Sequence, residues 1–211
     1  MMYRITGIIA FITLFIIDSM AQELFVDERD GQPYNTIVVN DSCVWMAENL
    51  RYNLPDAKVC AGSERGDDYE IIWNPITGDT CAWYYNYEQA QNVCPSGWHL
   101  PREEEWEMLI DFLGGWKKAG GKLKQHGAWE RDDTEGIKTS GFNALPLGYI
   151  NHKGNLVNTF CEAIWWSCSK IKTSLWGMSA LCFELNDGSN RVESWDIDID
   201  IKLSVRCVKD Y

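Results

Sequence analysis

Eight cysteines, all downstream of an apolar N-terminal segment, constrain this chain more than any other feature. Residues 5–17 are almost wholly apolar, Arg4 precedes them, and the small residues Ser19 and Ala21 follow. A basic start, a short apolar run and a small-residue site are typical of a secretory signal peptide. We therefore expect residues 1–21 to be a signal and residues 22–211 to form a single domain. An uncleaved N-terminal anchor is the alternative, although the apolar run is short for a membrane span.

Cysteines in an exported chain are expected to form disulfides, and their even number supports this expectation. Their spacing contains neither a C-x-x-C pair nor a cysteine–histidine cluster, which argues against a zinc site. The spacing alone leaves the pairing open. The eight residues are Cys43, Cys60, Cys81, Cys94, Cys161, Cys168, Cys182 and Cys207.

Acidic residues outnumber basic ones by 31 to 19, which makes the chain strongly anionic. An acidic surface repels phosphate, so neither nucleic acid nor an anionic membrane is an expected partner. No segment after the signal is apolar enough to span a bilayer. Together with the signal, this predicts a secreted, periplasmic or cell-surface protein.

The clearest helix is predicted over residues 102–113, where Trp106, Leu109, Ile110 and Leu113 form one apolar stripe. A shorter helix is predicted over residues 84–93, and residues 117–124 have the pattern of another helical turn. Strands are expected in a hairpin region at 24–52, then at 163–169, 179–186, 190–195 and 203–208. The Asp-Gly pair at 187–188 predicts a tight turn between two of these strands.

Five short motifs, in this order, resemble the Fibrobacter succinogenes major paralogous domain family. The resemblance extends over essentially the whole chain after the signal. The motifs are WMAENL at 45–50, CPSGWHLP at 94–101 with a following Glu-Trp, GFNALPLG at 141–148, WWS at 165–167 and SVRCVKD at 204–210.

The resemblance implies an α+β, C-type lectin-like fold with two short helices, small antiparallel sheets and long disulfide-stapled loops. The helix-entry motif is also similar to that of formylglycine-generating enzymes, which share this architecture. A lectin-like fold implies that Cys94 pairs with Cys207, and we also expect Cys60 to pair with Cys81. The remaining cysteines predict further bridges among Cys43, Cys161, Cys168 and Cys182, without favouring one pairing. Arg102 replaces the small polar residue expected at the helix start.

Catalytic readings of the sequence find little support. The three histidines, His99, His126 and His152, lie near no suggested nucleophile, and no hydrolase, zinc-protease or nucleotide-binding motif occurs. No pair of carboxylates stands out as a glycosidase dyad. A diverged oxidase of the formylglycine-generating type would need a redox-active cysteine pair, whereas Cys161 and Cys168 have a different spacing. We expect no enzymatic activity and no cofactor.

Calcium is the one metal that the sequence suggests. Asp196, Asp198 and Asp200 alternate with isoleucines, so a strand would place three carboxylates on one face. Such a face is either a calcium site or, more simply, a solvated acidic face, because calcium usually takes six or more oxygens. Glu184, Asn186 and Asp187 resemble the calcium ligands of sugar-binding lectins, but the partner motif of those proteins is absent.

The eleven tryptophans suggest a binding surface. Exposed aromatic rings suit sugar rings and protein contacts, although many tryptophans must also fill the core. We expect ligand contacts at Trp129, Trp176, Trp195 and Tyr149. The predicted function is an exported, non-catalytic binding module for a glycan or cell-surface ligand. A structural or adhesive surface protein that contacts other proteins is the alternative.

Overall fold

The computed structural model describes residues 23–40, 43–54, 83–131, 137, 139–175 and 177–211, and the backbone of three short strands between residues 58 and 70. The predicted signal segment, the two cysteines of the predicted Cys60–Cys81 pair and Trp176 lie outside the described residues. No helix in the described part of the chain is long and apolar enough to cross a membrane.

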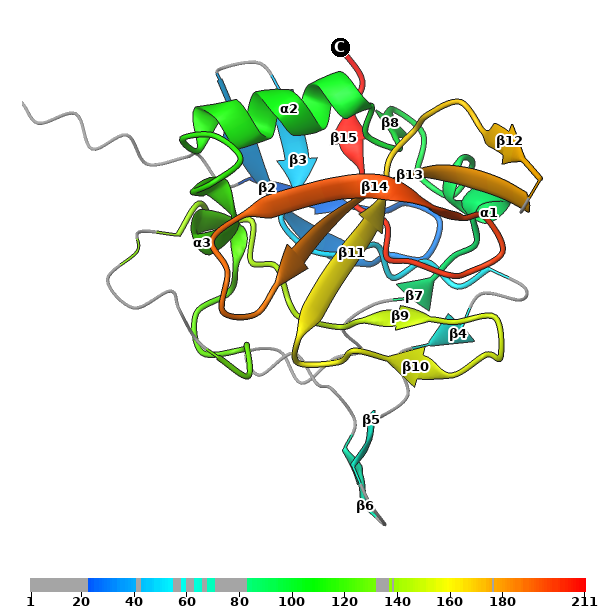
Figure 1. The fold of residues 1–211 in the computed structure, drawn as a ribbon. Helices are drawn as coiled ribbons and strands as arrows, with labels where there is room; N and C mark the ends of the chain where they lie inside the picture. The colour runs from blue at the N-terminus through cyan, green and yellow to red at the C-terminus, as the bar shows by residue number, and fades with distance from the viewer. Residues whose placement is uncertain are drawn as a thin grey trace, which may run out of the picture.

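The first sheet brings the two ends of the domain together (Figure 1). Its N-terminal strands form the hairpin region that the sequence predicts, and the C-terminal strand lies beside them. All neighbouring strands are antiparallel. In spatial order the strands are β1 (Leu24–Val26), β2 (Pro33–Val39), β3 (Cys43–Met46), β15 (Val208–Lys209) and β8 (Trp98–His99).

The second sheet is built around one long strand, β13 (Gly177–Asn186). One edge of β13 pairs with β14 (Val192–Asp198), and the other pairs first with β12 (Lys172–Ser174) and then with β11 (Glu162–Trp166). The β13–β14 hairpin turns at the predicted Asp-Gly pair, where Gly188 has a φ of 62°. This confirms the turn signal in the sequence.

Three two-stranded ribbons make up the other sheets of the described residues. The ribbons pair β9 (Tyr149–Ile150) with β10 (Leu156–Val157), β4 (Lys58–Val59) with β7 (Trp83–Tyr84), and β5 (Ser63–Arg65) with β6 (Asp68–Glu70). In Figure 1 the first two ribbons lie together below the second sheet.

The described chain contains three short helices: α1 (Tyr87–Ala90), α2 (Glu103–Phe112) and α3 (Ala119–Leu123). The expected fold names two of them, and the third, α3, lies within the helical turn predicted over residues 117–124. The predicted helix over residues 84–93 is too long. Its first residue, Tyr84, pairs in β7, and Tyr85 forms an isolated bridge with Leu203. Asn86 then caps the helix by accepting the Gln89 N–H at 2.9 Å.

Helix α2 confirms the clearest prediction from the sequence. Its apolar stripe is buried, and it packs on the first sheet through Trp106, Leu109 and Ile110. Arg102 provides no side-chain cap. Instead, Glu105 accepts the Arg102 N–H at 2.8 Å, which satisfies one of the unpaired donors at the helix start.

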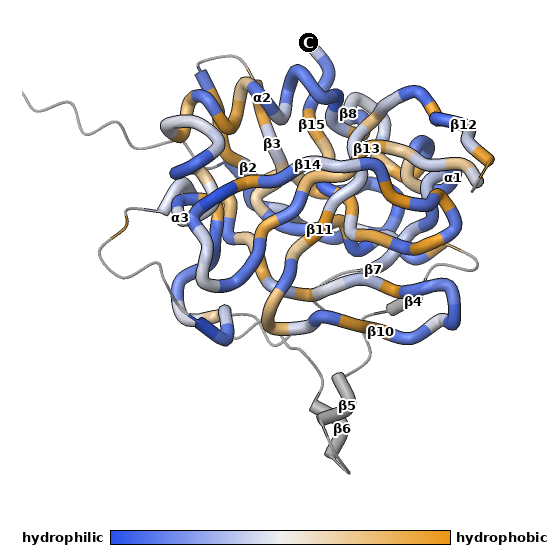
Figure 2. Tube along the Cα trace, viewed as in Figure 1, coloured by the Kyte–Doolittle hydropathy of each residue, from blue (hydrophilic) through white to orange (hydrophobic). Residues whose placement is uncertain are grey.

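Two large clusters with many aromatic rings form most of the core, one on each face of β11. Trp165 joins the cluster beneath α2, where Trp106 stacks on Phe183 with ring centroids 4.8 Å apart. Trp166, the next residue, joins the other cluster, as expected for alternating side chains along a strand. Apolar residues are spread along β2, β11 and β13 rather than gathered in one run (Figure 2). Many of the tryptophans therefore serve the core.

The predicted Cys94–Cys207 disulfide is present, linking positions 113 residues apart with Cα atoms 5.9 Å from each other. The further bridges expected among Cys43, Cys161, Cys168 and Cys182 are not formed, because Cys43, Cys168 and Cys182 are free thiols. The physical reason is placement: Cys43 belongs to one core cluster, Cys182 to the other, and Cys168 is exposed. Burial raises the pKa of the Cys43 and Cys182 thiols.

Two predicted strands are shorter than expected. Strand β11 ends at Trp166, because the Ser167 hydroxyl and the Cys168 N–H both bond to the carbonyl of Pro101. The predicted closing strand at 203–208 is reduced to β15, and residues before it make isolated bridges, among them Leu203 with Tyr85.

Candidate functional site

The edge strand β14 of the second sheet carries an aromatic ring that is oriented by a hydrogen bond to a carboxylate. Trp195 on β14 is 41% exposed, and its indole N–H donates to Oε2 of Glu184 at 2.5 Å. Glu184, on the adjacent strand β13, is only 8% exposed, and its Oε1 accepts a hydrogen bond from Asn186 Nδ2 at 2.6 Å. The antiparallel register places Trp195 opposite Cys182, on the same face of the sheet as Glu184.

Two more groups border this face from neighbouring elements. Tyr149 on β9 is half-buried; burial raises the pKa of its hydroxyl, and the charges of Glu162 and Glu184 add to the shift. Glu162 begins β11, and its carboxyl pKa is also raised, first by burial and then by Glu184 and Asp187. We call Tyr149, Glu162, Glu184, Asn186 and Trp195 the Trp195 surface. It combines aromatic faces with carboxylate acceptors, which is a combination suited to hydroxyl-rich ligands.

The four aromatic residues predicted to contact a ligand therefore differ in where they lie. Trp195 and Tyr149 lie on one surface, whereas Trp176 lies outside the described residues. Trp129 is 5% exposed and belongs to the core beneath α2, with its indole N–H donating to the carbonyl of Ala144 at 3.1 Å. The Trp129 ring is thus a core ring and not an exposed platform, because its loop folds back onto the core.

The expected three-carboxylate face for calcium is not formed. Strand β14 ends at Asp198, and the Asp200 N–H donates to Oδ1 of Asp198 at 2.8 Å in the turn that follows. Asp196 is paired with Lys172 Nζ at 2.6 Å. Among the described residues, these three aspartates do not bring their oxygens together as metal ligands would. Ile197 and Ile201 are buried as the alternation predicted.

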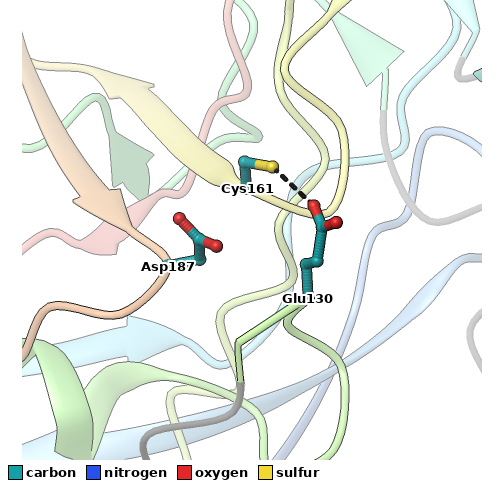
Figure 3. Close-up of side chains that lie close together, drawn as sticks. All are labelled: Glu130, Cys161 and Asp187. Atoms are coloured by element: carbon teal, nitrogen blue, oxygen red, sulfur yellow. Dashed lines mark hydrogen bonds between the residues drawn. The ribbon is translucent and has the colours of Figure 1, made fainter.

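A different group of potential metal ligands lies near the β13–β14 turn (Figure 3). Glu130, Cys161 and Asp187 each offer one ligand atom, and these atoms all lie within 4.8 Å of one another. The Cys161 thiol donates to Oε2 of Glu130 at 3.1 Å. Three separate segments supply the three residues, so no local motif could have identified the group.

His99 lies in a fixed structural network. Its Nδ1 is 2.6 Å from Oδ1 of Asp210, and its Nε2 is 2.9 Å from both oxygens of Glu105. The carboxylate of Glu105 is buried and also binds Arg102. The ring therefore links α2 to the C-terminal end of the chain, which agrees with a structural role for this histidine.

The architecture and disulfide define a mixed α+β domain with several small antiparallel sheets and a long-range covalent link between its middle and its end. Residues 39–209 match the Fibrobacter succinogenes major domain. The chain belongs to this family, as its five motifs indicated. No curated protein and no solved structure shows significant similarity to it.

Proposed function

We propose that this protein is an exported, non-catalytic binding module that holds a glycan or another cell-surface ligand on the Trp195 surface. The observation that carries the proposal is the exposed Trp195 ring, oriented by its bond to the buried carboxylate of Glu184. A ring held in one orientation loses little entropy when a ligand stacks on it. Burial of Glu184 and its bond to Asn186 keep the ring's partner in place.

The charge of the Trp195 surface restricts the kinds of glycan that we expect it to bind. Glu162 and Glu184 lie on one face of an already acidic protein, so anionic polysaccharides would be repelled. Neutral or amino-bearing sugars would meet aromatic faces and carboxylate acceptors instead. We therefore expect neutral or cationic glycans to bind more tightly than uronic acid polymers.

A C-type lectin-like fold belongs to the same proposal. Support comes from the Cys94–Cys207 bridge, which joins the region after the first helix to the region of the last strand. Export, to the cell surface, the periplasm or the medium, is proposed from the N-terminal signal pattern and from the disulfide, which persists in oxidising compartments.

An adhesive protein that contacts other proteins is the second candidate, and a specific feature favours it. Three large apolar side chains on or beside the β12–β13 hairpin, Ile171, Leu175 and Met178, are exposed, and Leu175 is fully exposed. Exposed apolar groups that form a contiguous patch mark protein contact sites. A diverged oxidase of the formylglycine-generating type is disfavoured, because it needs a close pair of cysteines. The Cys161 thiol is hydrogen-bonded to Glu130, whereas the Cys168 N–H is bonded to the carbonyl of Pro101.

A glycan array probed with the purified exported protein tests the proposal. We expect saturable binding to a subset of neutral or amino-bearing glycans, accompanied by a change in tryptophan fluorescence as a ligand covers Trp195. A flat array combined with capture of one defined protein, insensitive to competing sugar, would instead support the adhesive candidate.

A further inference from the structure

We propose that Glu130, Cys161 and Asp187 form a binding site for a thiophilic divalent cation of the Zn²⁺ class, and that Arg131 occupies part of this site as a tethered cation. The site goes beyond the proposed glycan-binding function and does not depend on it. It rests on the meeting of a sulfur and two carboxylates from three segments of the chain (Figure 3).

The backbone holds the three ligand positions together. The Asp187 N–H donates to the carbonyl of Cys161 at 2.7 Å, and the Glu130 N–H donates to the carbonyl of Phe160 at 3.0 Å. The side chains are half-buried or exposed, so they can rotate. Ligand atoms around tetrahedral zinc lie roughly 3.5 Å apart, since each is about 2.0–2.3 Å from the ion. The ligand atoms now lie within 4.8 Å of one another, so a small rotation of these side chains would bring them to that spacing.

The donor set selects the metal. A cysteine sulfur disfavours calcium and magnesium, which prefer oxygen alone, and favours zinc and its chemical relatives. Binding would convert the Cys161 thiol to a thiolate and release its proton to the solvent. Three protein ligands would leave a fourth position for water or for an atom of a bound ligand.

Arg131 shows that the site already attracts a cation. Its Nε and Nη2 donate to the two oxygens of Asp187 at 2.8 and 3.0 Å. Asp187 chiefly, and then Cys161 and Glu130, raise the pKa of this guanidinium. The Arg131 side chain is nevertheless 73% exposed, so a divalent ion can displace it at little cost.

The test uses the purified exported protein, stripped of metal and titrated with Zn²⁺ by calorimetry and with Co²⁺ by absorption spectroscopy. We expect one ion per chain and a thiolate-to-cobalt charge-transfer band. Cys161→Ser should abolish that band and weaken Zn²⁺ binding at least roughly tenfold. Asp187→Asn should weaken Zn²⁺ binding to a similar extent but leave the thiolate that gives the band. Arg131→Gln should tighten Zn²⁺ binding roughly two- to fivefold by removing the competing cation.

Cys168→Ser is the matched control, because Cys168 is a free and exposed thiol outside the group. It should leave both the band and the affinity unchanged. An intact Cys94–Cys207 bridge and an unchanged unfolding temperature establish that each variant is folded, and Asp187→Asn replaces Cys161→Ser if the latter misfolds. Unaltered Zn²⁺ affinity in the ligand variants, a cobalt spectrum without the band, or Cys161 recovered in a disulfide would each overturn the proposal.

Discussion

The buried guanidinium of Arg206 donates from Nε to Oδ1 of Asn49 at 3.0 Å, although 157 residues separate the two in the chain. The same oxygen accepts the indole N–H of Trp165 at 2.8 Å. Arg206 is 1% exposed, and burial lowers the pKa of its guanidinium, with Glu48 opposing that shift. Asn49 therefore accepts hydrogen bonds from two buried donors, one on β11 and one in the segment before β15.

This polar centre is built from residues of the motifs that the chain shares with its family. Arg206 also donates to the carbonyl of Phe142, and its guanidinium lies 3.8 Å from the centroid of the Phe142 ring. Asn49, Phe142, Trp165 and Arg206 come from four of the five motifs. In this chain these motifs therefore contribute to the buried core, whereas Tyr149 and Trp195 lie outside them.

Replacing Asn49 measures how much this buried polar centre contributes to the free energy of unfolding. Asn49→Leu leaves the Arg206 and Trp165 donors without their acceptor in a buried site, which should lower the free energy of unfolding by about 2–5 kcal/mol. Urea denaturation measures the change. The control is Asn155→Ala, at an exposed turn position, where a change within about 0.5 kcal/mol is expected. Equal effects of the two substitutions would contradict a central role for Asn49.

The Cys94–Cys207 bridge should be a major source of stability. Because it closes a loop of more than a hundred residues, the double substitution Cys94→Ser/Cys207→Ser should cost roughly 2–5 kcal/mol. Guanidinium denaturation of the variant and of the oxidised parent gives the difference. Cys168→Ser should leave the denaturation midpoint where it is. A double variant as stable as the parent would show that the bridge does not constrain the unfolded chain.

Glu105 and Glu104 are neighbours on α2, but only Glu105 is expected to contribute to stability. Glu105 is buried and binds both His99 and the Arg102 N–H, whereas Glu104 is exposed. Glu105→Ala should cost about 1–3 kcal/mol, because the Arg102 donor loses its acceptor. Glu104→Ala should change the unfolding free energy by less than about 0.5 kcal/mol. Thermal unfolding of the two variants side by side decides the matter, and similar losses would argue against the network.

Asp27 should confer part of the stability at neutral pH. Burial favours its neutral form, but the hydrogen bonds and charge of Arg29 outweigh burial and hold its pKa below the ordinary 3.8. The stabilisation is therefore present above that value and is lost as the pH falls through the lower, folded-state pKa. Asp27→Asn should cost about 1–3 kcal/mol at pH 7.

The difference between Asp27→Asn and the parent should shrink as the pH is lowered below about 4, where the unfolded carboxyl begins to bind a proton. Urea denaturation at a series of pH values gives this difference directly. Two stability curves that run parallel from pH 7 to pH 3 would mean that the Asp27–Arg29 pair contributes no pH dependence.

Local patterns predicted local elements well. The stripe of α2 and the Asp-Gly turn of the β13–β14 hairpin depend on residues a few positions apart, and both are confirmed. Predictions that required knowledge of the packing fared less well. Trp129 lies in a loop by sequence yet belongs to the core, and Asp200 follows the last paired residue of β14.

The spacing of residues along the sequence did not predict which distant segments come into contact. The Cys94–Cys207 pairing came from the family resemblance and not from the positions of the cysteines. Glu130, Cys161 and Asp187 meet only because the β13–β14 turn lies beside two loops. Similarly, nothing in the sequence indicates that Glu184 orients Trp195, since the two residues are brought together by the register of two strands.

The central claim, that the Trp195 ring binds the ligand, is tested most directly by titrating Trp195→Ala with the best glycan identified on the array. The matched control is Phe112→Ala, which removes another exposed aromatic ring, on α2. Losing a stacked aromatic ring should weaken binding about tenfold or more, as at other aromatic hot spots, while the Phe112 variant should bind like the parent. If Trp195→Ala bound the glycan with the parent's affinity, the Trp195 surface would not be the binding site.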